Sequence, residues 1–217
     1  VLNLIKLSRK FNVKSFVQAS TSSVYGDSKE KSFKINSETS KPDSIYAASK
    51  KASEVLLHAY HSLYKQNISI LRFFTVYGPC GRPDMAPFIF TQAAINNRLI
   101  NVFGTGNQKR DFTYIDDIVQ GIYKSSKLRG LNYLNLGNNR PVSINNLIKI
   151  ISQLANKKIK RVHKPSTPED VFYTSADISK TKRIMKWEPK TNLEKGIFKT
   201  YNWHIENNKW LKKIKVS

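Results

Sequence analysis

Phe16-Val17-Gln18-Ala19-Ser20 is the stretch that decides the fold, because it is a short apolar run typical of a buried β-strand and leads directly into hydroxyl-rich Thr21-Ser22-Ser23. A helical pattern follows over Ser44–Tyr64, and a second strand pattern over Ser69–Phe74. Both strand patterns are apolar on both faces, as in strands that helices cover on each side. Strands that alternate with long helices predict an α/β fold with a parallel sheet.

The alternation extends in both directions from this stretch. Upstream, Val1–Phe11 has apolar side chains near 3.6-residue spacing and predicts a helix that Asn12 closes. Beyond about residue 80 the strands become shorter, and we expect a smaller second lobe. A helix over Phe88–Asn96 continues the alternation. The elements expected in the second lobe are helices over Tyr114–Ser125, Ile144–Leu154 and Leu193–Asn207 and strands over Ile100–Phe103 and Tyr133–Leu136.

The charge of the chain is strongly positive, with 37 Lys and Arg against 15 Asp and Glu and a formal net charge of +22. Such a charge raises nucleic acid as a partner, because basic faces release counterions from phosphates. Here 28 of the basic residues are Lys, and most are dispersed along the chain rather than clustered on one segment. We therefore expect no nucleic-acid partner.

Cysteine and histidine usage excludes other classes of protein. Cys80 is the single cysteine and the four histidines are scattered, so neither an internal disulfide nor a zinc site is expected. No apolar run is long enough to cross a membrane, and the first residues lack the pattern of a signal peptide. We expect a cytoplasmic protein with no membrane partner.

Tyr46 and Lys50 are the residues best suited to acid–base chemistry. Their spacing of four places a phenol and an ammonium on one face of the predicted helix. A free Tyr has a pKa of about 10, and a nearby positive charge favours its phenolate form. The hydroxyls of Thr21-Ser22-Ser23 lie at the carboxyl end of the preceding strand, where they can meet that helix. Helices also hold Tyr and Lys at this spacing by chance, so both interpretations stay open at this point.

Five motifs occur in order along the chain: ASTSSVYG at 19–26, YAASK at 46–50, LRFFTVYGP at 71–79, GRPDMA at 81–86 and RDFTYIDD at 110–117. With them, the chain resembles the extended short-chain dehydrogenases/reductases, in the NAD-dependent epimerase/dehydratase family. Within that family it is most similar to the UDP-glucuronate 4-epimerase group. The resemblance covers nearly the whole chain, with one departure at Cys80, where these epimerases usually carry Trp. Packing beside Arg82 is therefore expected to be looser.

The resemblance implies three catalytic residues. Thr21 would hydrogen-bond the C4 oxygen of the sugar, and Tyr46 would act as general base and acid. Lys50 would lower the pKa of Tyr46 and hold the nicotinamide ribose of NAD.

The resemblance also implies binding residues. Tyr46, Lys50 and Phe74 would contact the NAD cofactor, Phe103 would lie near the uracil, and Arg110 would bind the diphosphate, since guanidinium groups suit phosphate oxygens. The substrate-binding residues implied are Thr21, Ser22, Ser23, Thr75, Arg82, Phe103, Arg110 and Asp170. Without the neighbouring motifs, Arg110 could form an ordinary surface ion pair. Phe103 could likewise be an ordinary core residue.

The glycine-rich loop of a dinucleotide-binding domain is missing, because no glycine precedes Gly26. We therefore expect a partial Rossmann-type parallel sheet that lacks its N-terminal strands, roughly a hundred residues at about 30 per strand-helix-strand unit. Residues 1–80 would be the C-terminal part of the NAD-binding domain. Residues 81–217 would be mostly a nucleotide-sugar-binding lobe, with some segments returning to the sheet. The chain alone is expected to be inactive, with a missing N-terminal segment or a second copy as its partner.

The leading hypothesis for function is NAD-dependent 4-epimerisation of a UDP-sugar, UDP-glucuronate to UDP-galacturonate. A UDP-glucose 4-epimerase is an alternative. A nucleotide-sugar 4,6-dehydratase is another, but elimination needs an acid and a base beside Thr21, where Ser22 and Ser23 stand. Those hydroxyls can instead donate hydrogen bonds to a C6 carboxylate, which favours a uronic acid. A further alternative, from a different class, is a non-catalytic remnant or half-enzyme.

Overall fold

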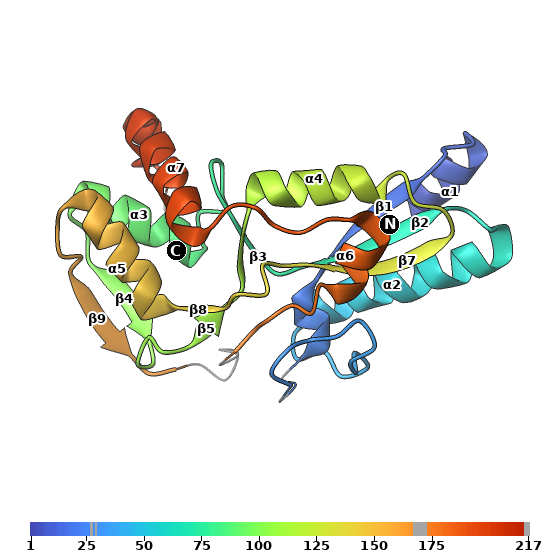
Figure 1. The fold of residues 1–217 in the computed structure, drawn as a ribbon, viewed down its shortest axis with the longest axis horizontal. Coiled ribbons are helices and arrows are strands. Elements are labelled where there is room, and N and C mark those ends of the chain that lie inside the picture. The colour runs from blue at the N-terminus through green and yellow to red at the C-terminus, as the bar shows by residue number, and fades with distance from the viewer. Residues whose placement is uncertain (27, 29, 167–172, 215–217) are drawn as a thin grey trace. The chain divides into compact units, whose positions relative to one another are not determined.

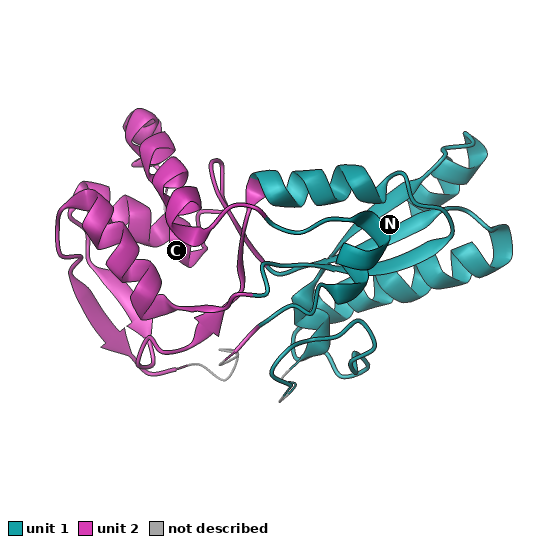
Figure 2. Cartoon of the chain, in the orientation of Figure 1, with its two compact units in different colours: residues 1–74, 116–139, 175–189 teal, residues 75–115, 140–174, 190–217 magenta. Residues whose placement is uncertain are grey.

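The computed structural model describes residues 1–217 except 27, 29, 167–172 and 215–217. These residues form two compact units, each made from separate stretches of the chain (Figure 2). Unit 1 comprises Val1–Phe74, Asp116–Asn139 and Ser175–Pro189, and unit 2 comprises Thr75–Ile115, Arg140–Thr174 and Lys190–Ser217. The first break between the units therefore follows Phe74 rather than residue 80.

Unit 1 is built on a parallel sheet of three strands in the order β1-β2-β7 (Figure 1). Its elements are α1 (Leu2–Lys10), β1 (Phe16–Thr21), the 3-10 helix η1 (Ser22–Tyr25), α2 (Ile45–Tyr64), β2 (Ile68–Phe73), α4 (Ile115–Ser125, whose first residue belongs to unit 2), β7 (Leu131–Leu136) and α6 (Ser179–Met185). The predicted α/β fold with parallel strands is confirmed. The strand expected at Tyr133–Leu136 is β7, and it lies in this sheet rather than in the smaller lobe.

Helices cover both faces of this sheet, and the alternation of side chains along β2 shows how. Ile68 and Ile70 face one side, where they pack with Ile5 of α1 and Leu57 of α2. Ser69 faces the other side and donates a hydrogen bond of 3.0 Å to the Ser125 carbonyl at the end of α4. As expected from its apolar pattern, β2 lies between two strands and two layers of helices.

The boundaries of α2 follow from its terminal residues. Ser44 accepts a hydrogen bond of 3.1 Å from the Ala47 N–H at the start of the helix, as a Ser N-cap does. At the other end, Lys65 adopts the left-handed conformation with φ of 55°. The predicted helix over Ser44–Tyr64 is therefore confirmed almost to the residue.

Unit 2 holds shorter strands and a helical layer. Its elements are β3 (Thr75–Tyr77), α3 (Ala86–Asn96), β4 (Ile100–Phe103), β5 (Lys109–Arg110), β6 (Phe112–Tyr114), β8 (Val142–Ser143), α5 (Ile144–Ala155), β9 (Arg161–Lys164), α7 (Leu193–Glu206) and α8 (Asn208–Leu211). β3 pairs with β6 and β4 with β9, both in parallel, whereas β5 and β8 are antiparallel. Sequence analysis missed β9 because its four residues are all exposed and give no apolar pattern.

No helix among the described residues is long and apolar enough to cross a membrane. In the same part of the chain, no group of three or more His, Cys, Asp or Glu side chains is arranged to hold a metal ion.

The core of unit 2 brings β3, β6 and α7 into close contact at Gly196. A Cβ atom built on Gly196 would lie 2.0 Å from the Tyr77 Oη and 3.0 Å from the Tyr114 ring. Tyr77 and Tyr114 are both buried, with their ring centroids 5.7 Å apart. The helix therefore approaches these strands at a distance that a side chain would prevent.

Gly196→Ala is expected to destabilise the chain by about 1–3 kcal/mol, the usual cost of overpacking a core. Helix propensity acts in the opposite direction, since Ala is favoured over Gly inside a helix by about 1 kcal/mol. The free energy of unfolding from urea titration measures the change. Gly130→Ala is the control, because nothing lies within 4 Å of its added Cβ and only its φ of 72° opposes the substitution. A variant Gly196→Ala as stable as the parent chain would contradict the close packing.

Candidate functional site

The three hydroxyl side chains of Thr21, Ser22 and Ser23 lie where β1 ends and the 3-10 helix η1 begins. Thr21 caps that helix: its Oγ1 accepts a hydrogen bond of 3.1 Å from the Ser23 N–H and donates one of 3.1 Å to the Ser23 Oγ. Thr21 is buried, Ser22 is half-buried and Ser23 is exposed. Thr21 is thus held in one place at the carboxyl edge of the sheet, where ligands bind in parallel α/β folds.

Lys50 joins the second functional element, α2, to the same strand. Its Nζ donates a hydrogen bond of 3.0 Å to the Ala19 carbonyl, two residues before Thr21. The same Nζ lies 5.8 Å from the centre of the Tyr46 ring, and Tyr46 is 49% exposed. The structure therefore brings the ammonium, an accessible phenol and the end of β1 together within unit 1.

Glu54, one turn after Lys50 on α2, makes a second connection to β1. Its Oε1 accepts a hydrogen bond of 2.6 Å from the Ser20 Oγ. Arg72 of β2 forms two hydrogen bonds to the same carboxylate, Nε to Oε1 at 2.9 Å and Nη2 to Oε2 at 2.8 Å. Arg72 and Glu54 are almost completely buried, at 3% and 1% exposure. The helix that carries Tyr46 and Lys50 is thus fastened to both β1 and β2.

The buried ion pair extends into a polar network at the end of the sheet. Arg72 Nη1 donates to the Tyr25 Oη at 3.1 Å, and Tyr25 donates in turn to the Asn135 Oδ1 at 2.7 Å. Burial opposes the charge on Arg72, but its hydrogen bonds to Glu54 and the charges of its partners raise the pKa of Arg72 above its usual range. Burial raises the pKa of Tyr25, against the opposing effect of Arg72.

Phe74 packs into the aromatic cluster beside this network. Its ring centre lies 6.2 Å from that of Phe33 and 6.5 Å from that of Tyr25, and the side chain is 4% exposed. Any contact of Phe74 with a cofactor would therefore involve its backbone rather than its ring.

Glu54→Gln is expected to lower the free energy of unfolding by about 3–5 kcal/mol, because it leaves the Arg72 charge buried without its counter-charge. Chemical denaturation of the purified chain measures the loss. The matched control is Glu188→Gln, which removes a carboxylate from the exposed pair with Lys182 and is expected to cost about 1 kcal/mol or less. The double variant Glu54→Leu with Arg72→Met should lose less than Glu54→Gln, since it removes both charges. Equal losses at Glu54 and Glu188 would contradict this account.

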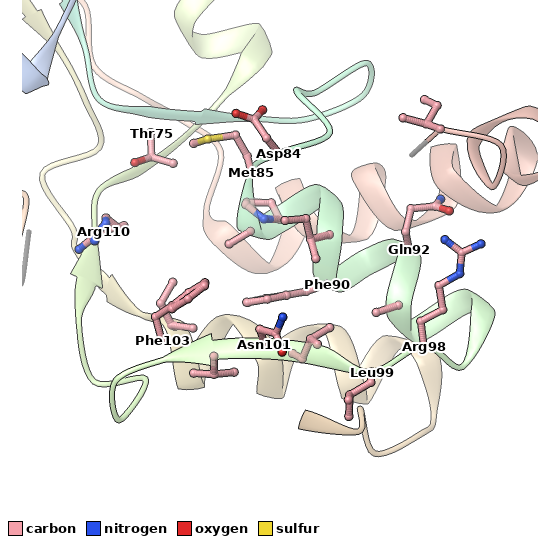
Figure 3. Close-up of a pocket in the computed structure, with 18 of the residues that line it drawn as sticks. Thr75, Asp84, Met85, Phe90, Gln92, Arg98, Leu99, Asn101, Phe103 and Arg110 are labelled. Atoms are coloured by element: carbon pink, nitrogen blue, oxygen red, sulfur yellow. The ribbon is translucent and has the colours of Figure 1, made fainter. Parts of the chain in front are cut away.

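Unit 2 contains a second candidate site, a groove of about 1190 Å³ that we name the α3–β4 groove. Figure 3 shows Thr75, Phe103 and Arg110 toward one end and Gln92, Arg98 and Leu99 toward the other. Apolar residues of α3 and β4, among them Phe90 and Val102, line the part between. The structure therefore gathers three predicted substrate-binding residues, Thr75, Phe103 and Arg110, around one hollow.

Arg82 forms a two-pronged ion pair with Asp84, which lines the same groove. Its Nε donates to the Asp84 Oδ1 at 3.0 Å and its Nη2 donates to Oδ2. The Arg82 hydrogen bonds hold the pKa of the Asp84 carboxyl below its usual range, against the effect of its slight burial. The guanidinium of Arg82, which the resemblance implies as a substrate-binding residue, is paired here with a carboxylate of the chain itself.

A buried polar network lies behind the wall of the groove. Gln92 Nε2 lies 2.8 Å from the His204 Nδ1, and the Asn96 Nδ2 donates to the Gln92 Oε1 at 3.0 Å. His204 is 0% exposed, its Nε2 has no partner among the described residues, and the ring packs edge-on against Phe88. Burial lowers the pKa of His204 from 6.5 to about 4, so the ring is neutral near pH 7.

This histidine should make the stability of the chain depend on pH. Unfolded His204 takes up a proton below pH 6.5, whereas the folded ring resists protonation down to about pH 4. Its contribution is therefore complete above about pH 6.5 and is lost as the pH falls toward 4, by about 3 kcal/mol at 1.36 kcal/mol per pKa unit. Urea titrations from pH 7 to pH 4 should fall more steeply for the parent chain than for His204→Gln.

The exposed His163 provides the control for this prediction. His163→Gln should keep the pH dependence of the parent chain. Parallel curves for the parent chain and His204→Gln would show that the buried ring does not resist protonation.

The predicted site residues thus fall into two groups. Thr21, Tyr46 and Lys50 lie together in unit 1, and Thr75, Phe103 and Arg110 lie together in unit 2. Asp170 lies outside the described residues.

Sequence analysis missed the role of Glu54 and Arg72. A signal was available: Arg72 is the only charged residue in a strand whose other residues are apolar or small. A charge at such a place needs a buried partner.

Residues 1–132 match the model of the NAD dependent epimerase/dehydratase family. The chain belongs to this family. Among its members, UDP-glucuronate 4-epimerase of Thermodesulfobacterium geofontis is 46% identical over 99% of this chain, and UDP-glucuronate 4-epimerase 3 of Arabidopsis thaliana is 39% identical over 94%. The match spans 67% of the bacterial relative and 52% of the plant one.

A solved member of the epimerase family has the same fold. The crystal structure of UDP-glucuronic acid 4-epimerase from Bacillus cereus in complex with UDP-glucuronic acid and NAD is 33% identical, with a TM-score of 0.84. The comparison covers 89% of this chain and 62% of that one. The fold of this chain therefore matches about two thirds of such an epimerase.

The residues present fit one end of the cofactor that this family uses. The accessible Tyr46 and the anchored Lys50 stand at the carboxyl edge of a parallel sheet, which is where the family of folds binds its nucleotides. No glycine-rich loop for a pyrophosphate occurs in the 217 residues. The chain thus provides a phenol and an ammonium at the edge of the sheet where such folds bind nucleotides.

Proposed function

We propose that this chain forms the catalytic and substrate-binding part of a UDP-sugar 4-epimerase that interconverts UDP-glucuronate and UDP-galacturonate. The observation that carries the proposal is the arrangement of Tyr46, Lys50 and Thr21, with Lys50 tying the Tyr46 helix to the strand that ends in Thr21. The name of the 46% identical bacterial relative supports the choice of substrate.

Each residue of this group has a chemical role in the proposal. Tyr46 takes the proton from the C4 hydroxyl of the sugar and later returns it. Thr21 hydrogen-bonds the C4 oxygen, and the ammonium of Lys50 stabilises negative charge on the phenol oxygen while holding the ribose of the cofactor. NAD, when bound, supplies the acceptor for the C4 hydride and its return to the opposite face. Glu54 and Arg72 keep the helix in register with the strand.

We further propose that unit 1 contributes to the NAD-binding domain and that unit 2 binds the nucleotide part of the substrate. The α3–β4 groove supports this, because Arg110 offers a guanidinium for the diphosphate and Phe103 an aromatic ring for the uracil. Ser22 and Ser23 would donate hydrogen bonds to the uronate carboxylate, and Asp170 would bind the nucleotide ribose.

The test uses a hybrid in which the N-terminal third of the Thermodesulfobacterium geofontis relative precedes this chain. With NAD bound, the hybrid is expected to convert UDP-glucuronate to UDP-galacturonate, followed by proton NMR of the anomeric signals. Tyr46→Phe should lower the rate about 100-fold or more, because it removes the general base. Tyr123→Phe, at an exposed Tyr on α4, is the control and should keep the parent rate.

The other outcomes identify the alternatives. Activity on UDP-glucose but not on UDP-glucuronate would make the protein a UDP-glucose 4-epimerase. Full activity in Tyr46→Phe would remove Tyr46 from the mechanism. A folded hybrid that binds NAD and turns over neither sugar would favour the non-catalytic alternative.

A further inference from the structure

The α3–β4 groove has a second cationic end that the proposed function does not use. Arg98, Lys212 and Lys213 line it there, together with the apolar Leu99 and Ile214. Figure 3 shows Arg98 and Leu99 at the opposite end of the groove from Arg110. A volume of about 1190 Å³ exceeds the roughly 300–1,000 Å³ of a pocket for one small ligand. The groove therefore has room beyond a ligand at Arg110.

The segments that carry these three cations are held together by packing and hydrogen bonds. Asn96, at the end of α3, and Asn208, at the start of α8, exchange two side-chain hydrogen bonds of 3.1 and 3.2 Å. Leu211 of α8 is 2% exposed, and the following turn carries Lys212 and Lys213. Arg98 Nη2 donates to the Lys212 carbonyl at 3.4 Å. Residues 114 positions apart in sequence are thus fixed beside each other.

Among the described residues, no Asp or Glu lines this end of the groove. Segments 85–110, 140–166 and 207–214 contain no Asp or Glu, and Asp84 is the only carboxylate that lines the groove in the described part of the chain. Asp84 is paired with Arg82. Lys157, Lys158 and Lys160 adjoin Arg98 around a smaller hollow and add to the positive potential. Three cations that line the same end of one groove create a positive potential that favours an anion there.

We propose that the Arg98 end of the α3–β4 groove is an anion-binding site, separate from the Arg110 end, that takes a phosphate group. Arg98 offers the fork of donors that suits phosphate oxygens, and the two ammonium groups add point charges. The inference uses only the groove itself and stands whether or not the proposed epimerase activity does.

Calorimetric titration of the purified chain at low ionic strength, with inorganic pyrophosphate as the probe, tests the site. We expect two molecules to bind per chain. The triple variant Arg98→Gln, Lys212→Gln, Lys213→Gln should lose one of them, with binding weakened about a hundredfold, since each hydrogen bond to a charged group adds roughly tenfold or more. Arg110→Gln should lose the other. The control Lys6→Gln, Lys149→Gln, Lys195→Gln removes the same charge at exposed positions and should keep both.

Pyrophosphate binding that the Arg98 triple variant leaves intact would overturn the proposal, as would a single site that both the Arg98 triple variant and Arg110→Gln abolish. Equal losses in the control would assign the binding to net charge alone. Competition with UDP distinguishes the source of the phosphate. UDP should displace pyrophosphate only from the Arg110 end. Displacement from both ends would show that one nucleotide spans the groove. A chain that fails to bind UDP but keeps the Arg98 site would contradict the proposed function and leave this inference standing.

Discussion

The ion pair between Arg72 and Glu54 is the interaction on which unit 1 depends. A charge on a buried strand is costly unless its partner is buried with it, and both hydrogen bonds of the pair are shorter than 3.0 Å. Because Glu54 also accepts from Ser20, the pair determines how α2 lies against two strands at once. The positions of Tyr46 and Lys50 follow from that register.

The same principle of buried polar contacts appears in unit 2 with neutral groups. Gln92 and Asn96 of α3 connect to Asn208 of α8, and His204 adds α7 to the network as an uncharged ring. These amides leave no net charge inside the unit. The cations of the groove, by contrast, are exposed at its surface: Arg98, Lys212 and Lys213.

Much of the fold could be predicted from the sequence, because local signals identify single elements. The Ser44 cap and the apolar spacing determine α2, and Ile100–Phe103 alternates as a strand should. Contacts between distant segments could not be predicted in this way. Arg98 and Lys212 approach each other only through the packing of α3 and α8, and no local sequence pattern predicts this contact.

In the candidate site, too, the residues with a local signal could be predicted and those that depend on distant contacts could not. Tyr46 and Lys50 could be found because a helix puts residues four apart on one face. Glu54 resembles a solvated charge in the sequence, since Lys51 lies three residues before it. Its burial depends on the strand that carries Arg72, 18 residues away.

The interleaving of the two units has a consequence for how the chain is made. Unit 1 is completed only when Ser175–Pro189 has left the ribosome, by which time most of unit 2 has already been synthesised. Its sheet also joins strands more than 45 residues apart, and such distant parallel pairings form slowly. The nascent chain therefore holds an unfinished apolar sheet while later segments emerge, so synthesis at the usual pace exposes it to chaperones and to aggregation. Neither unit corresponds to a continuous segment that a gene fragment or a protease cut could release intact.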